Sequence, residues 1–357
     1  MTLAAQSLAA TVRAAFEEGG ATVVEPAILQ SAETLLDLYG EDIRARAYVT
    51  ADPARGELML RPDFTVPIAL THLQSGQSHA RYTYAGPVFR RQEVDLTRAS
   101  EYLQVGLETF GDPDPIAADA AIFAEFATVL APWGLRAVTG DIGILTAAVA
   151  GLPLSDARRA ALMRHLWRPR RFRALLDRFA KPQAHAHRAD LLAAVNPLPP
   201  EIPVTGLRGR GEILARIDAL RAEAQEPPLD AEPIALIDAI LAIRAPAGHA
   251  VEQLADIAVD LPSLIPAVDR LKARLEALAR RDVDVSALAF EASYGRTSME
   301  YYDGFVFGFV ADARPDLPPA ASGGRYDALT ARLSGQGTSA VGGVIRPEAL
   351  LALEGRA

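Results

Sequence analysis

The spacing of apolar and polar positions changes along the chain, and these changes outline the expected elements. Over the first twenty residues, apolar positions recur at helical spacing and stop at Gly19-Gly20, which predicts an amphipathic helix rather than a secretory leader. Helical and strand-like stretches then alternate to about residue 145. The clearest strands are Glu57–Arg61 and Glu101–Phe110, with a strand pair or one bent strand around Gly86 between them, and a short strand is expected at Pro132–Thr139.

The middle of the chain has a different pattern. Between about 150 and 283, Ala, Leu and Arg recur at helical spacing, and prolines divide the stretch into separate helices. Strand character returns at Ala287–Glu291 and Tyr301–Val310. We therefore predict an α+β protein in which a sheet domain is interrupted by a mainly helical insertion. The expected bounds are 1–145 and 285–357 for the sheet domain and 146–284 for the insertion.

Composition and charge exclude several classes of site and partner. The 357 residues include no cysteine, which excludes disulfides, thiolate zinc sites and cysteine nucleophiles and fits a cytoplasmic location. The net charge of −9 disfavours a nucleic-acid partner, because nucleic acids are polyanions and bind to basic protein surfaces. No stretch approaches the roughly 18 uninterrupted apolar residues of a membrane span. We therefore expect neither a nucleic-acid nor a membrane partner.

Two other features have simple explanations. The most basic stretch, Arg164–Arg173, includes Trp167 and is interpreted as a solvated helix face; a contact with a protein partner or RNA is the alternative. His185 and His187 lie two positions apart with no third ligand nearby in the sequence, so we expect no metal site.

Polar residues that could bind a ligand lie next to the first predicted strands. Asp63 and Thr65 stand where a helix is expected to begin, and they either cap that helix or present a carboxylate and a hydroxyl to a ligand. Arg90 leaves a strand just after Gly86-Pro87. There its guanidinium can bind a carboxylate or phosphate, or it can simply be exposed.

Two strands combine polar groups with glycines on one face. In Glu101–Phe110, alternation places Gln104 and Glu108 on the same face, opposite three apolar side chains. Gly106 lies between them and is expected to leave space for a small molecule, although a solvated sheet face gives the same pattern.

The stretch Tyr301–Val310 repeats this arrangement. Tyr302 and Gly304 share one face, opposite Tyr301. Gly323 and Gly324 further along would let the backbone approach a ligand closely.

In this order and spacing, the motifs resemble those of histidyl-tRNA synthetase, a class II aminoacyl-tRNA synthetase, over about 10–145 and 285–353. The matching stretches are Val24-Glu-Pro26 for motif 1, Gly86–Gln92 for motif 2, and Gln104–Glu108 with Glu300–Tyr302 for the histidine pocket. The resemblance implies an antiparallel sheet flanked by helices, and a self-dimer. The residues that it assigns to L-histidine are Asp63, Thr65, Arg90, Gln104, Glu108, Tyr301 and Tyr302.

The chemistry of free histidine suits this set. The acceptors Asp63, Thr65 and Gln104 fit the ammonium, and Arg90 fits the carboxylate. Glu108 and the hydroxyl of one of the two tyrosines fit the imidazole ring.

Other positions depart from the synthetase pattern where ATP and tRNA are handled. Thr297 stands where the family has an arginine before the paired tyrosines, and the neighbouring Arg296, one position away, is a candidate to replace it in part. Motif 3 normally ends Gly-Leu-Glu-Arg-Leu, whereas here it reads Arg346-Pro-Glu-Ala349-Leu, and Gln92 replaces the glutamate of motif 2. The chain also ends where a synthetase continues for roughly 100 residues. These departures predict no aminoacylation.

A chain that keeps a histidine pocket but lacks the residues of synthetase chemistry is similar to the regulatory subunits of ATP phosphoribosyltransferase. That resemblance implies a non-catalytic protein without a cofactor, which joins a short catalytic subunit in a hetero-octamer. It would activate that subunit and transmit feedback by histidine in the first step of histidine biosynthesis. Two alternatives remain: a histidyl-tRNA synthetase or related amino-acid-activating enzyme, and a synthetase-like RNA-binding module.

Overall fold

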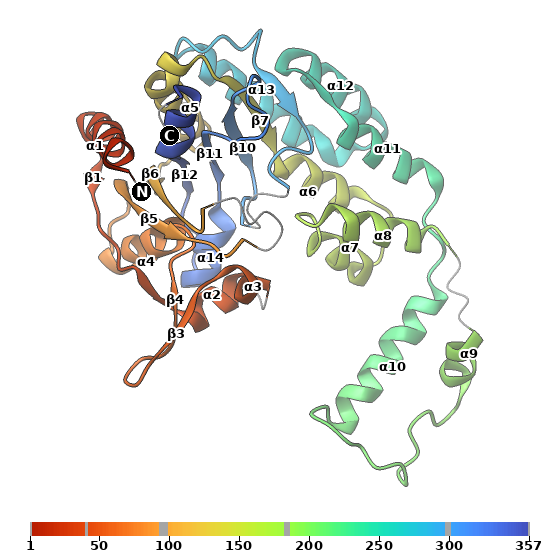
Figure 1. Cartoon of the computed structure of the whole chain (residues 1–357). Helices are drawn as coiled ribbons and strands as arrows, with labels where there is room; N and C mark the ends of the chain where they lie inside the picture. The colour runs from red at the N-terminus through yellow and green to blue at the C-terminus, as the bar shows by residue number, and fades with distance from the viewer. Residues whose placement is uncertain (1, 40–41, 93–98, 182–185, 297–300, 356–357) are drawn as a thin grey trace.

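The computed structural model describes residues 2–39, 42–92, 99–181, 186–296 and 301–355. Within these residues the main element is a nine-stranded sheet in the order β1-β5-β6-β12-β11-β10-β7-β9-β8 (Figure 1). In chain order its strands are β1 Thr22–Val23, β5 Ala80–Phe89, β6 Glu101–Phe110, β7 Arg136–Asp141, β8 Arg244–Pro246, β9 Ala289–Glu291, β10 Phe305–Val310, β11 Ala321–Arg325 and β12 Ala340–Ile345.

Neighbouring strands of this sheet run antiparallel except at two places. The pairs β1–β5 and β7–β9 are parallel, and the other six pairs are antiparallel. The sheet is therefore mostly antiparallel and is built from both ends of the chain, which confirms the predicted α+β class.

One face of the sheet is covered by α1 (Leu3–Glu18), α5 (Pro115–Leu130) and α15 (Pro347–Leu353). The apolar side chains that alternate along β6 and β10 pack under these helices in one core cluster. Phe307 of β10 meets Phe123 and Phe126 of α5 with ring centroids 5.6 and 5.4 Å apart. These aromatic contacts bury large apolar surfaces and fix α5 on the sheet.

The opposite face is only partly covered. The helices α4 (Thr65–Ser75) and α14 (Asp327–Ser334) pack there with a second core cluster, which includes Tyr84, Val306 and Tyr326. A separate three-stranded sheet belongs to the same region, in the order β2 (Leu29–Ser31), β4 (Gly56–Leu60) and β3 (Val49–Asp52), with α2 (Ala32–Tyr39) and α3 (Asp42–Arg46) beside it.

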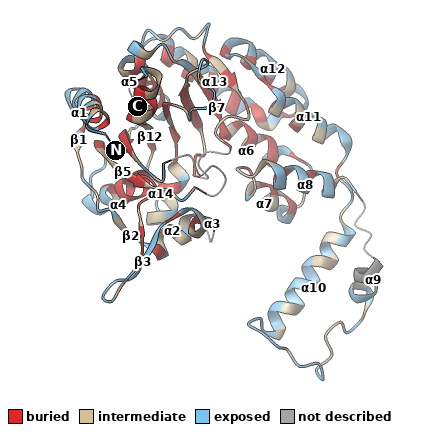
Figure 2. Ribbon diagram, viewed as in Figure 1, coloured by how far each residue is buried: buried red, intermediate tan, exposed pale blue. Residues whose placement is uncertain are grey.

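The chain between the two parts of the sheet is helical. Its helices are α6 Ile142–Gly151, α7 Asp156–Met163, α8 Pro169–Phe179, α9 Ala186–Ala193, α10 Arg210–Gln225, α11 Ala231–Ala242, α12 Ala247–Asp260 and α13 Ile265–Ala279. Most of them share the core cluster of the sheet, α13 packs on α5, and β8 joins the sheet edge. In contrast, α9 and α10 stand away from the body (Figure 1), and α10 is largely exposed (Figure 2). The domain division at 146 and 284 stays a prediction.

Two predicted strand bounds are wrong for local reasons. The strand expected at 132–139 begins only at Arg136, because Ala131–Trp133 form a 3₁₀ turn that Gly134 ends with a φ of 56°. The strand expected from Tyr301 begins at Phe305, and Tyr301 and Tyr302 lie in the loop before it. The bent strand around Gly86 is the single strand β5.

Among the described residues, the segment Pro115–Trp133 is long and apolar enough to cross a membrane. It consists of α5 and the 3₁₀ turn that follows, and it packs against both the sheet and α13. It also carries Asp119, a buried carboxylate paired with Arg274 and Arg325. Within this fold it is therefore a core helix.

Candidate functional site

One pocket on the partly covered face of the sheet brings together all seven residues singled out in the sequence. It encloses about 330 Å³ of empty space, counted with its open mouth. Its lining consists of Asp63, Thr65, Arg90, Gln104, Glu108, Tyr301, Tyr302, Ser322, Tyr326, Gly342, Gly343, Val344 and Arg346.

Glu108 of β6 lies at one end of the pocket and is 1% exposed. Its carboxylate accepts hydrogen bonds from the hydroxyls of Tyr326 at 2.6 Å, Tyr84 at 3.0 Å and Thr65 at 3.2 Å. Burial raises the pKa of Glu108 to about 7, although these three hydrogen bonds oppose the shift. Its proton occupancy therefore changes close to neutral pH.

Thr65 does not act as a helix cap. The cap position of α4 is Phe64, which provides no capping side chain, and the hydroxyl of Thr65 instead donates to Glu108 and lies 3.2 Å from that of Tyr301. Arg61 fixes this region, because its guanidinium donates to the carbonyls of Pro26 and Pro87. The capping interpretation of Thr65 is therefore wrong.

The other end of the pocket combines an amide with two guanidinium groups. The side-chain oxygen of Gln104 is buried and accepts no hydrogen bond from the described residues. Arg90 donates to the carbonyl of Pro62 at 2.8 Å and lies 4.0 Å from the carboxylate of Asp63. Arg346 reaches the same space from the end of β12.

The sheet register sets the distance between the two ends. Gln104 and Glu108 are four residues apart on one strand, so their backbone positions are about 13 Å apart on the same face. Gly342 of β12 lies opposite Glu108, and a Cβ there would come within 1.6 Å of the carboxylate. Glycine at this position is thus required for Glu108 to turn into the pocket.

The loop before β10 supplies the two tyrosines. Because it is not a strand, Tyr301 and Tyr302 do not point to opposite faces, as alternation predicted, and both line the pocket. The indole N–H of Trp167 donates to the carbonyl of Tyr302 at 3.0 Å, and the carboxylate of Asp303 accepts the backbone N–H of Ala328. The loop is thus fixed from both α14 and the helical segment.

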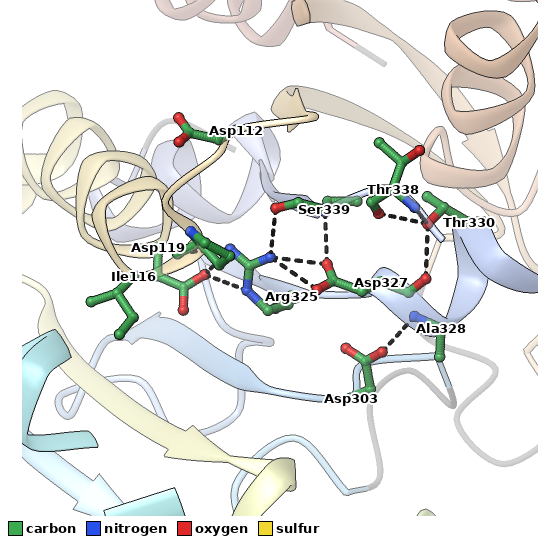
Figure 3. Close-up of polar contacts among 12 residues, drawn as sticks. Asp112, Ile116, Asp119, Asp303, Arg325, Asp327, Ala328, Thr330, Thr338 and Ser339 are labelled. Carbon is green, nitrogen blue, oxygen red and sulfur yellow. Dashed lines mark hydrogen bonds and ion pairs between the residues drawn. The ribbon is translucent and has the colours of Figure 1, made fainter. Parts of the chain in front are cut away.

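A buried network of charges holds the strand that leads to Tyr326. Arg325 donates to Asp119 of α5 at 2.9 Å and to Asp327 at 2.9 Å, and it also contacts the hydroxyl of Ser339 at 3.0 Å (Figure 3). Asp119 in turn accepts from Arg274 of α13. Since Tyr326 follows Arg325 directly, this network positions a hydroxyl that donates to Glu108.

The glycines of these strands make room for protein side chains rather than directly for a ligand. A Cβ at Gly106 would lie 2.1 Å from the hydroxyl oxygen of Tyr84, and one at Gly308 would lie 1.8 Å from that of Tyr294. A Cβ at Gly324 would lie 2.9 Å from the ring of Tyr302. The expectation that Gly106 and Gly324 open space for a ligand is therefore wrong; they accommodate the aromatic side chains that shape the pocket.

Four pocket or pocket-supporting residues were not predicted from the sequence: Tyr84, Ser322, Tyr326 and Arg346. The register of β5 with β6 places Tyr84 opposite Gly106, and this pairing joins two strands, so no pattern within either strand indicates it. The only sequence pattern that includes Arg346 is the altered motif 3.

Arg296 does not take the place of the missing arginine. Its guanidinium donates to the carbonyl of Leu166 at 2.8 Å and lies 5.0 Å from the ring centre of Phe172, and it is not part of the pocket lining. Thr297 and Glu300, like His185, lie outside the described residues.

Charge is therefore distributed unevenly along the pocket. Glu108 and three hydroxyls surround one end, while two guanidinium groups, an amide and Asp63 surround the other. Such a site can bind a small zwitterion with an additional hydrogen-bonding ring or chain.

Comparison with known proteins places this chain in a family. The model of the histidyl-tRNA synthetase family matches residues 2–201 and 212–350. The ATP phosphoribosyltransferase regulatory subunit of Mesorhizobium japonicum is 31% identical over 349 residues and covers 92% of each chain. That of Agrobacterium fabrum is 33% identical over 337 residues, covering 88% of this chain and 87% of the relative.

Solved structures agree on the fold. An ATP phosphoribosyltransferase regulatory subunit/histidyl-tRNA synthetase from Bacillus halodurans has a TM-score of 0.68 at 18% identity, over 98% of this chain and 79% of that chain. A histidyl-tRNA synthetase from Nostoc has a TM-score of 0.65 at 17% identity, over 99% and 72%. The fold is that of a class II aminoacyl-tRNA synthetase core. The chain belongs to the histidyl-tRNA synthetase-like family of ATP phosphoribosyltransferase regulatory subunits.

Proposed function

We propose that this chain binds free L-histidine in the pocket and regulates a short ATP phosphoribosyltransferase catalytic subunit in the cytoplasm. It activates that subunit and transmits feedback by histidine in the first step of histidine biosynthesis. The observation that carries this proposal is the convergence of Asp63, Arg90, Gln104 and Glu108 on one pocket, in a chain whose relatives are regulatory subunits.

Each part of histidine has a complementary group. The ammonium is bound by Asp63 and by the amide oxygen of Gln104, which accepts no hydrogen bond from the described residues. The carboxylate is bound by Arg90. Glu108 accepts a hydrogen bond from the ring N–H, and the hydroxyl of Tyr301 or Tyr302 donates a hydrogen bond to the other ring nitrogen. Thr65, first assigned to the ammonium, supports Glu108 instead through its hydrogen bond at 3.2 Å.

Regulation requires that histidine bind one assembly state more tightly than another. A differential of about 1–3 kcal/mol between the two states changes their populations 5- to 150-fold. The pocket is well placed for this effect, because the loop of Tyr302 is bonded to Trp167 of the helical segment. The chain itself acts without catalytic residues, since Thr297 and Ala349 replace two arginines of the synthetase pattern.

The assembly test mixes this chain with a short catalytic subunit. We expect co-elution as a hetero-octamer of four subunits each, containing self-dimers of this chain, and a higher phosphoribosyltransferase turnover that histidine lowers. Light scattering and initial rates measure the two effects. Gln104→Ala is the matched variant: it should still co-elute and activate, but its activation should no longer respond to histidine. Absence of both co-elution and activation would reject the regulatory role.

A second assay separates regulation from amino-acid activation. Histidine-dependent exchange of pyrophosphate into ATP should stay at background for the purified chain. Exchange above background would favour a synthetase-like enzyme, and salt-sensitive tRNA binding would favour an RNA-binding module.

Histidine affinity should depend on pH through Glu108. The pKa of Glu108 is raised to about 7 by burial, so its carboxyl group is mostly protonated at pH 5.5 before histidine binds. The ionised carboxylate accepts a ring N–H more strongly than the protonated carboxyl group does, so binding favours release of this proton. We expect the affinity to fall roughly tenfold per pH unit below 7.

Calorimetry between pH 5.5 and 8, in buffers of different ionisation enthalpy, measures both the affinity and the released proton. Glu108→Gln has no proton to release, so its profile reports the titration of the ligand alone. Identical pH profiles for this variant and the native chain would contradict the role of Glu108.

A further inference from the structure

Arg346 is a cation of the pocket to which neither the family pattern nor the proposed function gives a role. It lies between the end of β12 and the start of α15, at the position where motif 3 of the synthetases has a glycine. Its guanidinium donates to the carbonyl of Pro319 at 2.8 Å and to the hydroxyl of Ser322 at 3.0 Å. Both contacts hold the group beside the pocket, and both partners are neutral.

The guanidinium of Arg346 has no acidic partner among the described residues, since its only polar contacts there are Pro319 and Ser322. Burial lowers the pKa of Arg346, and the positive charge of Arg90 lowers it as well. An arginine remains charged even so, and a half-buried cation without a counterion is costly. An anion in the pocket would remove this cost.

The position of Arg346 selects which end of a ligand it meets. Ile345, just before it, is paired with Val105, while Gly342 is paired with Glu108. Arg346 therefore lies at the Gln104 end of β6, away from Glu108. Arg90 follows β5, whose last residues pair with the same end of β6. Two guanidinium groups thus approach this end from the strands on either side of it.

We propose that Arg346 binds the carboxylate of the amino acid in the pocket together with Arg90, and so makes the site selective for a free carboxylate. This inference rests on the proposed binding of histidine and deepens it. Ser322 is a positioning residue, because its hydroxyl accepts from the guanidinium and holds it in place. At the position where motif 3 of the synthetases has a glycine, which has no side chain, this chain provides a second cation for the ligand.

The test compares L-histidine with L-histidinol, which carries a hydroxymethyl group in place of the carboxylate. Calorimetry on the full chain should show histidine bound at least roughly 100-fold more tightly than histidinol. Arg346→Met should weaken the affinity for histidine about 10- to 100-fold and change the affinity for histidinol by no more than about twofold. Arg346→Lys should recover part of the loss. Arg136→Met, a surface arginine outside the pocket, is the matched control and should change neither affinity.

The outcomes separate this inference from the proposed function. If the native chain binds histidine and Arg346→Met binds it equally well, the role of Arg346 is wrong while histidine binding stands. An equal loss for both ligands would assign Arg346 a structural role only and also overturn the inference. Absence of histidine binding to the native chain would overturn both. If Arg346→Met does not fold, Arg346→Lys and Ser322→Ala with the same two ligands decide. Tighter binding of inorganic pyrophosphate than of histidine would identify the anion as phosphate and overturn the carboxylate assignment.

Discussion

Replacing Arg274 by methionine is expected to lower the free energy of unfolding by about 3–5 kcal/mol. The guanidinium of Arg274 donates to Asp119 at 2.9 Å and to Asp141 at 2.7 Å, and the three side chains are at most 5% exposed. Methionine retains an apolar stem beside Phe305, but it leaves Asp141 as a buried charge without its cation. Urea unfolding followed by circular dichroism measures the change.

A surface ion pair provides the matched control. Arg136 and Asp312 are 3.0 Å apart, with side chains 45% and 64% exposed, so Arg136→Met should cost less than about 1 kcal/mol. The double variant Asp141→Asn/Arg274→Met should lose less free energy of unfolding than the two single variants together, because the uncompensated charge is removed. If Arg274→Met is no more destabilising than Arg136→Met, the network does not stabilise the fold as proposed.

This network explains why the helical segment is not a simple addition to the sheet. Arg274 belongs to α13, within the predicted insertion, yet its two partners lie in α5 and at the start of α6. Local periodicity reveals a helix and its apolar face, but it contains no information on which distant aspartate an arginine meets. The sequence therefore predicted the helices of this segment but not their fusion with the core of the sheet.

The strands show the same limit at shorter range. The alternation along Glu101–Phe110 predicted β6 with its observed bounds, because one face of that strand is buried against α1 and α5. The strands β2 and β3 were not predicted, since both are short, contain no buried residue and show no alternation. Tyr301 and Tyr302 were assigned to a strand because aromatic residues favour strands, whereas Asp303 and Trp167 hold them in a loop.

The pocket was predictable as a set of residues but not as a geometry. Order and spacing of motifs identified the seven side chains that the fold brings together. Strand pairing then decided the rest: Tyr84 fills the space above Gly106, and Gly342 frees the space for Glu108. These relations join residues far apart in sequence, so no pattern within one segment contains them.

Gln104→Ala is expected to lower the affinity for histidine about 10- to 100-fold while leaving the fold intact. The amide oxygen of Gln104 is buried and accepts no hydrogen bond from the described residues, so its removal breaks no hydrogen bond to that oxygen within them. Glu108→Gln should be more severe, at least roughly 100-fold, because the ring N–H loses a charged acceptor. Calorimetric titration with histidine and thermal unfolding of each variant separate affinity from stability.

Glu108→Ala is a poorer test of the same role. It would leave the hydroxyls of Tyr84, Thr65 and Tyr326 without their shared acceptor, and each buried hydroxyl left unsatisfied costs about 1–3 kcal/mol. Glutamine keeps one acceptor oxygen at that position and so retains part of this network. Gln6→Ala, an exposed glutamine-to-alanine change in α1, is the matched control and should change neither the melting temperature nor the affinity. Normal histidine affinity in both Gln104→Ala and Glu108→Gln would show that histidine, if bound, lies elsewhere on the chain.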